Sequence, residues 1–341
     1  MELIDPDEEA ELAEIVRGFL ALQARTATEG NSRLRRGVHA KGVCVRAVFE
    51  VLDVRDGRDP ALASRLARGV FCKPVALPAI VRFSNASPAL GRDAVDDVRG
   101  MAFRVEPAAL LGGRSRFLDF SLQSAPTLPF NDTHELAVFS KVFTAPNPAV
   151  ALGSLLFEDQ MTFARTMRAA SQQKRQRLLP YQQLRYWSAA PFRHGTADIV
   201  KYSAWPAGNN LARPLNAQNR NALQDELLRH VNEDDRMSEF EFGLQLLDID
   251  RMIFQGRRRN EAFWIDNTAV EWPETQAPFH TVARLTLVPS SQVDPSECES
   301  LRIDTGGNCL PEFQPIGRMS EIRRRVVQAS QRARTIDHNA G

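Results

Sequence analysis

The first regular pattern along the chain is helical. Between residues 8 and 27, apolar residues recur at spacings of three and four, at Leu12, Ile15, Val16, Phe19 and Leu20. This spacing places them on one face of a helix. It therefore predicts an amphipathic N-terminal helix over about 8–27.

The period then changes to two. Between Val43 and Val51, apolar residues alternate with Arg46 and Glu50, and three more β-rich segments follow at 80–84, 99–105 and 117–123. Glycine, proline or aspartate bounds each of them, as is typical of strands. Because four such segments fall within about 80 residues, they favour an antiparallel sheet or barrel over repeated βαβ units.

Helical periodicity returns in the middle of the chain, and strands follow it. Helices are expected at 132–143, 159–179 and 219–231, with an irregular stretch around Pro191 to Pro214. Strand patterns recur at 240–249 and 281–288, and a basic helix is expected at 320–334. We therefore predict a single α+β domain over 1–341: one barrel with strands within about 43–123 and 240–290, a helical insertion at about 132–235 and a C-terminal helix at about 320–334.

Charge and hydropathy exclude several classes of partner. The 43 basic and 42 acidic residues nearly cancel, so no overall field favours nucleic acid. No run of about 18 apolar residues exists that could span a membrane. The start, Met1 to Glu9, is acidic where a secretory signal is basic, which favours the cytoplasm. The oligomeric state is left open, a homo-oligomer included.

Common catalytic and metal-binding motifs are missing. Four cysteines, at 44, 72, 298 and 309, show no C-x-x-C spacing and no histidines at zinc-site distances, so we expect free thiols and no metal site. His134-Glu135 begins an H-E-x-x-H motif that ends in Val138. Glycine-rich nucleotide loops and the G-x-S-x-G motif are also missing from the sequence, so dehydrogenase, kinase and hydrolase functions have no support.

Four blocks in the first part of the chain carry a family resemblance. They are Val38-His39-Ala40-Lys41-Gly42, Arg82-Phe83-Ser84-Asn85, Asp96 to Phe103 and Asp119 to Pro126. Taken in order, and with later segments up to about residue 334, they resemble the catalase superfamily, in particular its small haem-containing members. The resemblance implies an eight-stranded antiparallel barrel around which haem b is held.

The resemblance also implies roles for individual residues. His39 corresponds to the distal acid/base that moves a proton between peroxide oxygens, with Ser84 supporting its ring. Arg36, Arg82 and Arg334 fall where the family pairs arginines with the haem propionates, a task suited to a planar, permanently charged donor.

Two positions depart from the family pattern. Gln123 stands where the family has a distal asparagine, so its amide is displaced by an extra methylene. Val327 stands where the family has the tyrosine whose phenolate binds iron, one helical turn after Arg323. The alternative ligands nearest in the sequence, none at a matching position, are Cys309, Met319, His280 and His338.

Without a phenolate beside it, Arg323 needs another partner. A buried guanidinium next to an apolar valine is costly unless it is paired or hydrogen-bonded. The sequence therefore predicts either a carboxylate that holds Arg323 or an anionic ligand in the pocket.

These residues support competing hypotheses for the function. The first is a haem-pocket enzyme that acts on peroxide or on a fatty-acid hydroperoxide, with weak or absent catalase activity. The second is a haem-free protein that binds or transforms a small organic molecule with His39 as a base, and the third is a catalytically silent subunit.

Overall fold

A computed structural model of the chain describes residues 6–28, 36–88, 90–106, 117–208, 210–233 and 237–339. Most of the acidic start thus lies outside the described residues. The helices are α1 (Pro6–Thr28), α2 (Pro60–Leu66), α3 (Thr133–Phe143), α4 (Pro148–Gly153), α5 (Phe157–Lys174), α6 (Ala222–Asn232), α7 (Glu261–Asp266), α8 (Pro295–Ser300) and α9 (Arg318–Asn339). The strands are β1 (Gly42–Val51), β2 (Val75–Asn85), β3 (Arg99–Val105), β4 (Leu118–Gln123), β5 (Tyr186–Trp187), β6 (Phe192–His194), β7 (Asp198–Pro206), β8 (Glu239–Leu246), β9 (Ile253–Phe254), β10 (Arg257–Arg258) and β11 (Phe279–Gln292).

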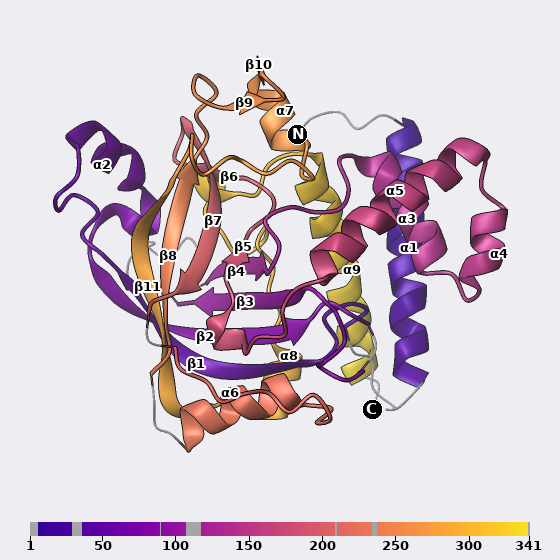
Figure 1. Cartoon of the computed structure of the whole chain (residues 1–341), viewed down its shortest axis with the longest axis horizontal. Helices are drawn as coiled ribbons and strands as arrows, with labels where there is room; N and C mark the ends of the chain where they lie inside the picture. Colours follow the sequence, from indigo (N-terminus) through magenta and orange to yellow (C-terminus); the bar gives the residue numbers. More distant parts are fainter. Residues whose placement is uncertain are drawn as a thin grey trace.

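Eight of these strands form a closed antiparallel barrel, which confirms the predicted fold (Figure 1). Neighbours follow in the order β4, β3, β2, β1, β11, β8 and β7. The short β5 closes the ring, because Trp187 pairs with Gln123 of β4 on one side and with Ser203 of β7 on the other.

Aromatic side chains fill the inside of the barrel. Phe103 stacks on Phe120 with ring centroids 4.7 Å apart, and Phe242 lies 5.4 Å from Phe49 and 5.5 Å from Tyr202. Each of these rings alternates along its strand with residues that face outward. Because the interior is packed, a binding site has to lie on the outer face of the barrel.

The long helices cover part of that outer face. Figure 1 shows α9 beside the barrel and α1 beyond it, with α3 and α5 around α1 and α4 farthest from the barrel. Leu12 and Ile15 of α1 pack with Leu136 of α3 and with Met319 and Ile322 of α9 in one apolar cluster. The apolar face predicted for the N-terminal helix thus positions α9 against the barrel.

Two sequence expectations are wrong. The stretch around Pro191 to Pro214 is not irregular: it contains β6 and β7, of which β6 pairs with β7 and β7 pairs with β8. The cysteines are not all free, since Cys44 and Cys298 form a disulfide, while Cys72 and Cys309 remain thiols. A separation of 254 residues leaves no local motif, and only the barrel topology brings the two cysteines together.

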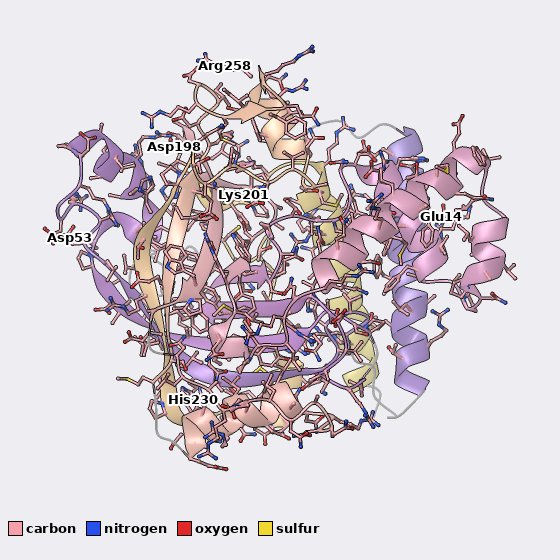
Figure 2. All side chains as sticks on the ribbon, viewed as in Figure 1. Glu14, Asp53, Asp198, Lys201, His230 and Arg258 are labelled. Atoms are coloured by element: carbon pink, nitrogen blue, oxygen red, sulfur yellow. A yellow bond between two sulfur atoms is a disulfide. The ribbon has the colours of Figure 1, made fainter. Side chains whose placement is uncertain are left out.

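Lys201 is a buried cation in the barrel wall, on β7 (Figure 2). Its Nζ has no hydrogen-bond partner within the described ranges and lies 4.8 Å from the centre of the Trp272 ring. Burial lowers the pKa of Lys201 to about 7.

None of the described helices combines the length and apolar character needed to cross a membrane.

Candidate functional site

A cavity of about 200 Å³ lies between the outer face of the barrel and α9. Most of its lining comes from the segment before β1, strands β2 to β4, the loop after α8 and one face of α9, and Phe19, Ala190, Phe192 and Pro315 complete it. The principal lining residues are Arg36, His39, Arg82, Ser84, Gly100, Ala102, Ser121, Asp304, Thr305, Arg323, Val327, Ser330 and Arg334.

Strand register explains which barrel residues meet there. Arg82 of β2 pairs with Ala102 of β3, which pairs with Ser121 of β4. Two residues further along β2, Ser84 pairs with Gly100 of β3. These residues alternate with the aromatic core, so they form adjacent rows on the outer face.

His39 is held in place by its backbone and by Ser84. Its φ of +56° lies in the left-handed region, which is uncommon for residues other than glycine and is found mainly where surrounding structure enforces it. Its Nδ1 lies 3.0 Å from Ser84 Oγ. A Cβ on Gly100 would come within 2.8 Å of that nitrogen, so glycine is needed for the ring to approach the strand.

The surroundings of His39 keep its ring neutral. Burial, followed by the charges of Arg82, Arg323 and Arg36, lowers the pKa of His39 to about 3. At neutral pH the imidazole therefore carries no charge and is able to accept a proton.

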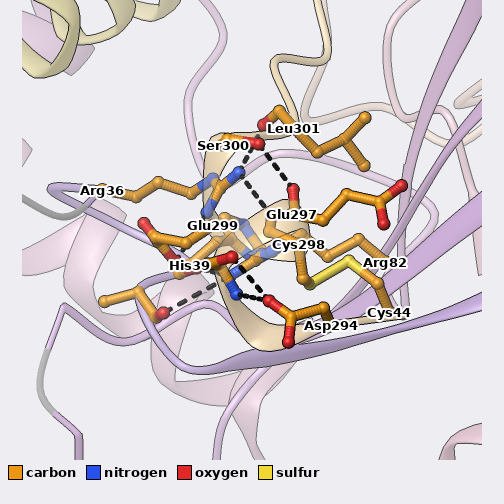
Figure 3. The surroundings of a disulfide bond; sticks show 12 residues. Arg36, His39, Cys44, Arg82, Asp294, Glu297, Cys298, Glu299, Ser300 and Leu301 are labelled. Atoms are coloured by element: carbon orange, nitrogen blue, oxygen red, sulfur yellow. Dashed lines mark hydrogen bonds and ion pairs between the residues drawn. A yellow bond between two sulfur atoms is a disulfide. The ribbon is translucent and has the colours of Figure 1, made fainter. Parts of the chain in front are cut away.

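Two of the predicted arginines pair with one carboxylate, that of Glu299, which Figure 3 shows with Arg36. Glu299 lies 3.0 Å from Arg36 and 3.8 Å from Arg334, while Arg82 donates to the carbonyl oxygen of His39 at 2.8 Å. Burial, only partly offset by Glu299, lowers the pKa of Arg82 to about 9 and that of Arg334 to about 10. In the described part of the chain, Nε of Arg82 and Nε of Arg334 have no hydrogen-bond partner.

Arg323 lies in the same cavity, and its guanidinium makes no hydrogen bond or ion pair with any described residue. Burial lowers its pKa. The next two residues of the helix are also arginines, but each has a partner: Arg324 pairs with Glu321 at 2.5 Å and Arg325 pairs with it at 3.0 Å. The sequence predicted either a protein carboxylate that holds Arg323 or an anionic ligand in the pocket. No such carboxylate is present among the described residues.

The predicted face of the C-terminal helix is the one that lines the cavity. Arg323, Val327, Ser330 and Arg334 all contribute, as their helical spacing requires. Val327 is 38 % exposed, so it stands where the cavity meets solvent.

Gln123 is not among the lining residues. Its side-chain amide turns away and donates to the carbonyl oxygens of Thr127 at 2.8 Å and Ala125 at 3.3 Å. Of the expected distal set, the structure therefore brings His39 and Ser84 together but leaves Gln123 outside the cavity.

The alternative iron ligands do not reach the cavity either. Among the described side chains, Cys309 and His280 do not line it, and Met319 is buried in the cluster between α1, α3 and α9. The side chain of His338 lies outside the described residues. No group of three or more metal-ligating side chains occurs in the described ranges.

The cavity residues suit the propionates of a haem group but not its iron. The partly unsatisfied N–H groups of Arg82 and Arg334 suit carboxylates such as propionates. On α9, however, the described cavity residues are Ser320, Arg323, Arg324, Val326, Val327, Ser330, Gln331 and Arg334, none of which is an ordinary iron ligand. The site therefore accommodates the anionic part of haem without an axial ligand from this helix.

Sequence reasoning missed Glu299. It lies on the six-residue α8, whose sequence has no periodicity or motif that marks it as part of the site. Only the tertiary structure places its carboxylate between Arg36 and Arg334.

The fold and the cavity allow comparison with known proteins. The chain is similar to a fungal catalase (15 % identity, TM-score 0.61, covering 90 % of this chain and 59 % of that one) and to a bacterial catalase (16 %, 0.60, 92 % and 58 %). It is also similar to catalase A from Saccharomyces cerevisiae (16 %, 0.57, 92 % and 62 %). The fold is therefore that of the catalases, and the chain spans about three fifths of their length. No protein-family model matches the sequence, and the comparison with curated proteins finds no match.

Proposed function

We propose that the cavity binds a small organic acid, whose carboxylate pairs with Arg323, and that it does so without iron ligated by the protein. The observation that carries this proposal is the partly buried Arg323 guanidinium, which lines the cavity without a partner among the described residues. Five arginines and a single carboxylate, Asp304, line the cavity. Glu299 and Glu321 offset part of this charge, which leaves the surroundings of the cavity net positive.

The energetics favour an anionic ligand. Removing a cation from water costs several kcal/mol unless a partner compensates it. A ligand carboxylate that accepts two hydrogen bonds from Arg323 supplies that compensation, and each bond to a charged group contributes about 1.5–3 kcal/mol. The binding energy thus comes mainly from charge pairing.

The size of the cavity limits the ligand. A volume of about 200 Å³ equals roughly seven water molecules at about 30 Å³ each, which suits a short organic acid. A longer chain extends past Val327 into solvent, because that side chain is partly exposed. A fatty-acid hydroperoxide meets both conditions and is the substrate favoured by the sequence resemblance.

His39 couples ligand binding to proton uptake. An anion beside Arg323 offsets one of the three arginine charges that depress the pKa of His39. The bound ligand therefore raises this pKa and makes the neutral ring a stronger base. In a bound hydroperoxide, such a base is suited to take the peroxide proton, while Ser84 keeps the ring oriented.

The test uses two probes of equal shape, octanoate and the neutral octanamide, in isothermal titration calorimetry. We expect octanoate to bind at least 10-fold more tightly at pH 7. Near pH 5, titration in buffers of different ionisation enthalpy should reveal proton uptake with octanoate that the His39→Gln variant lacks. Equal affinity for the two probes would refute the proposal.

A haem-dependent peroxide enzyme with weak catalase activity is the second candidate. The free Nε groups of Arg82 and Arg334 favour it, because two propionates would use both. An absorption spectrum of protein produced with ample haem distinguishes the candidates. A stoichiometric Soret band would favour the second, and its absence the first.

A further inference from the structure

The Cys44–Cys298 disulfide lies at the edge of the proposed site (Figure 3). Cys44 of β1 pairs directly with Arg82 of β2, so the disulfide continues the row of residues that lines the cavity. Its other cysteine belongs to α8, the helix that carries Glu299. The bond thus ties the carboxylate-bearing helix to the barrel.

The segment held by the disulfide occupies two of the cavity arginines. Arg36 donates to the carbonyl oxygen of Leu301 at 2.5 Å and pairs with Glu299 at 3.0 Å. Arg334 donates to the carbonyl oxygen of Glu299 at 3.0 Å. While α8 stays in this position, Arg36 and Arg334 face the protein's own acceptors instead of a ligand.

Few other contacts hold α8 against β1. The backbone N–H of Val293 donates to the carbonyl oxygen of Cys44 at 3.0 Å. A small apolar cluster joins Val293 to the two cysteines. The ion pair between Arg46 and Glu297, at 3.6 Å, is about half exposed and contributes little. The covalent bond is therefore the main restraint between α8 and β1, while Arg36 and Arg334 hold Glu299 itself.

A second cavity gives access to the disulfide. It measures about 320 Å³ and is lined by Cys298, Glu297, Arg104 and Arg302, among others. Cys298 lines it and is 6 % exposed, whereas Cys44 is 1 % exposed and does not. Arg104 already pairs with Asp119 at 2.8 Å, but Arg302 makes no ion pair within the described ranges. The cavity thus presents one sulfur and one available cation.

We propose that Cys44–Cys298 is a redox site at which a small anionic thiol regulates ligand binding in the first cavity, an inference that rests on the proposed function. The thiolate attacks Sγ of Cys298, the S–S bond breaks and Cys44 leaves as a thiolate that takes up a proton. A second thiol then attacks the mixed disulfide, which leaves two protein thiols and one molecule of oxidised small disulfide. Two electrons pass from the two small thiols to the protein disulfide.

Reduction frees α8 to move, because its covalent restraint is lost. Glu299 then competes less for Arg36 and Arg334, so both guanidiniums become available to an anion. We expect octanoate to bind about 10-fold more tightly to the reduced protein than to the oxidised one.

The first experiment tests the site of attack. Oxidised full-length protein in a Cys72→Ser background is treated with glutathione, which is anionic, or with the neutral 2-mercaptoethanol, and the mixed disulfide is located by peptide mass mapping. The adduct should form on Cys298, and Arg302→Gln should slow glutathione at least threefold relative to 2-mercaptoethanol. An adduct on Cys44, or an unchanged ratio of rates, would overturn the proposed entry route.

The second experiment tests the coupling to ligand binding. Octanoate affinity is measured for the oxidised protein, the reduced protein and oxidised Glu299→Gln, with the Cys44→Ser/Cys298→Ser variant added where it folds. The reduced and Glu299→Gln proteins should gain about 10-fold in affinity. Equal octanoate binding in both redox states refutes the regulation. No octanoate binding in any state refutes the proposed function, and the thiol-exchange rates of the first experiment then decide whether the disulfide is a redox site.

Discussion

Replacement of Arg323 by methionine should stabilise the protein and weaken its ligand binding at the same time. Methionine replaces the apolar stem of the side chain but removes the guanidinium and its charge. In the structure that charge lies partly buried in the cavity without a partner among the described residues. Its removal relieves a desolvation cost and breaks no hydrogen bond.

The size of the effect follows from the surroundings of Arg323. Apolar replacement of buried charges stabilises proteins by roughly 1–4 kcal/mol, and the partial opening of the cavity to solvent lowers the expected gain to roughly 1–3 kcal/mol. An unfolding entropy of about 2.1 cal/mol/K per residue over 341 residues converts this into a Tm increase of about 1.5–4 °C. Binding of octanoate should weaken about 10- to 150-fold, the equivalent of a charge-assisted hydrogen bond.

Arg325→Met is the matched control. Arg325 lies on the same helix but pairs with Glu321 at 3.0 Å and with Glu9 at 2.5 Å. Its replacement should cost up to about 1 kcal/mol and leave octanoate binding unchanged.

Differential scanning calorimetry and titration calorimetry measure both quantities. Nuclear magnetic resonance provides a third measurement, because loss of the Arg323 charge should raise the pKa of His39. If Arg323→Met lowers Tm and binds octanoate as tightly as wild type, Arg323 has a structural partner and the reasoning fails.

Three further predictions concern other positions. Val327→Tyr, with Arg323 one turn earlier, should raise haem occupancy and give a tyrosinate-ligated ferric spectrum, while Val327→Phe should not; equal haem content in both variants would contradict this. Lys201→Met should raise the free energy of unfolding at pH 7 by roughly 2–4 kcal/mol, since a buried cation is lost. In wild type that free energy should rise between pH 7 and pH 10.5, where only the unfolded chain keeps the lysine proton, and in Lys201→Met this rise should be absent from urea titrations. His39 should bind a proton only in the unfolded chain between about pH 3 and pH 6.5, so stability should fall with acidification by at most about 1.4 kcal/mol per pH unit from this residue. In acid titrations, His39→Gln should remove the loss of stability that comes from His39. It should leave the loss that comes from His194, whose pKa burial lowers to about 4.

Short-range patterns explain why much of the fold could be predicted. Alternation in β1 and helical spacing in α1 each arise within a few residues, because burial on one side of a single element decides them. The same holds for α9, where spacing alone placed Arg323, Val327, Ser330 and Arg334 on one face. β7 was missed because it lies among prolines and very short segments: its neighbour β6 has only three residues, and its long partner β8 is distant in sequence.

The candidate site, like the fold, could be predicted from the sequence only in part. The sequence by itself determined six of the eight barrel strands and, through its resemblance to the catalases, the approach of His39 to Ser84 and the arginines that line one cavity. Only the tertiary structure decided where Gln123 directs its amide, that Glu299 lies between Arg36 and Arg334, and that Cys44 meets Cys298. These contacts join segments whose side chains obey no common period, so the closure of the barrel and the packing of α8 and α9 against it determine them.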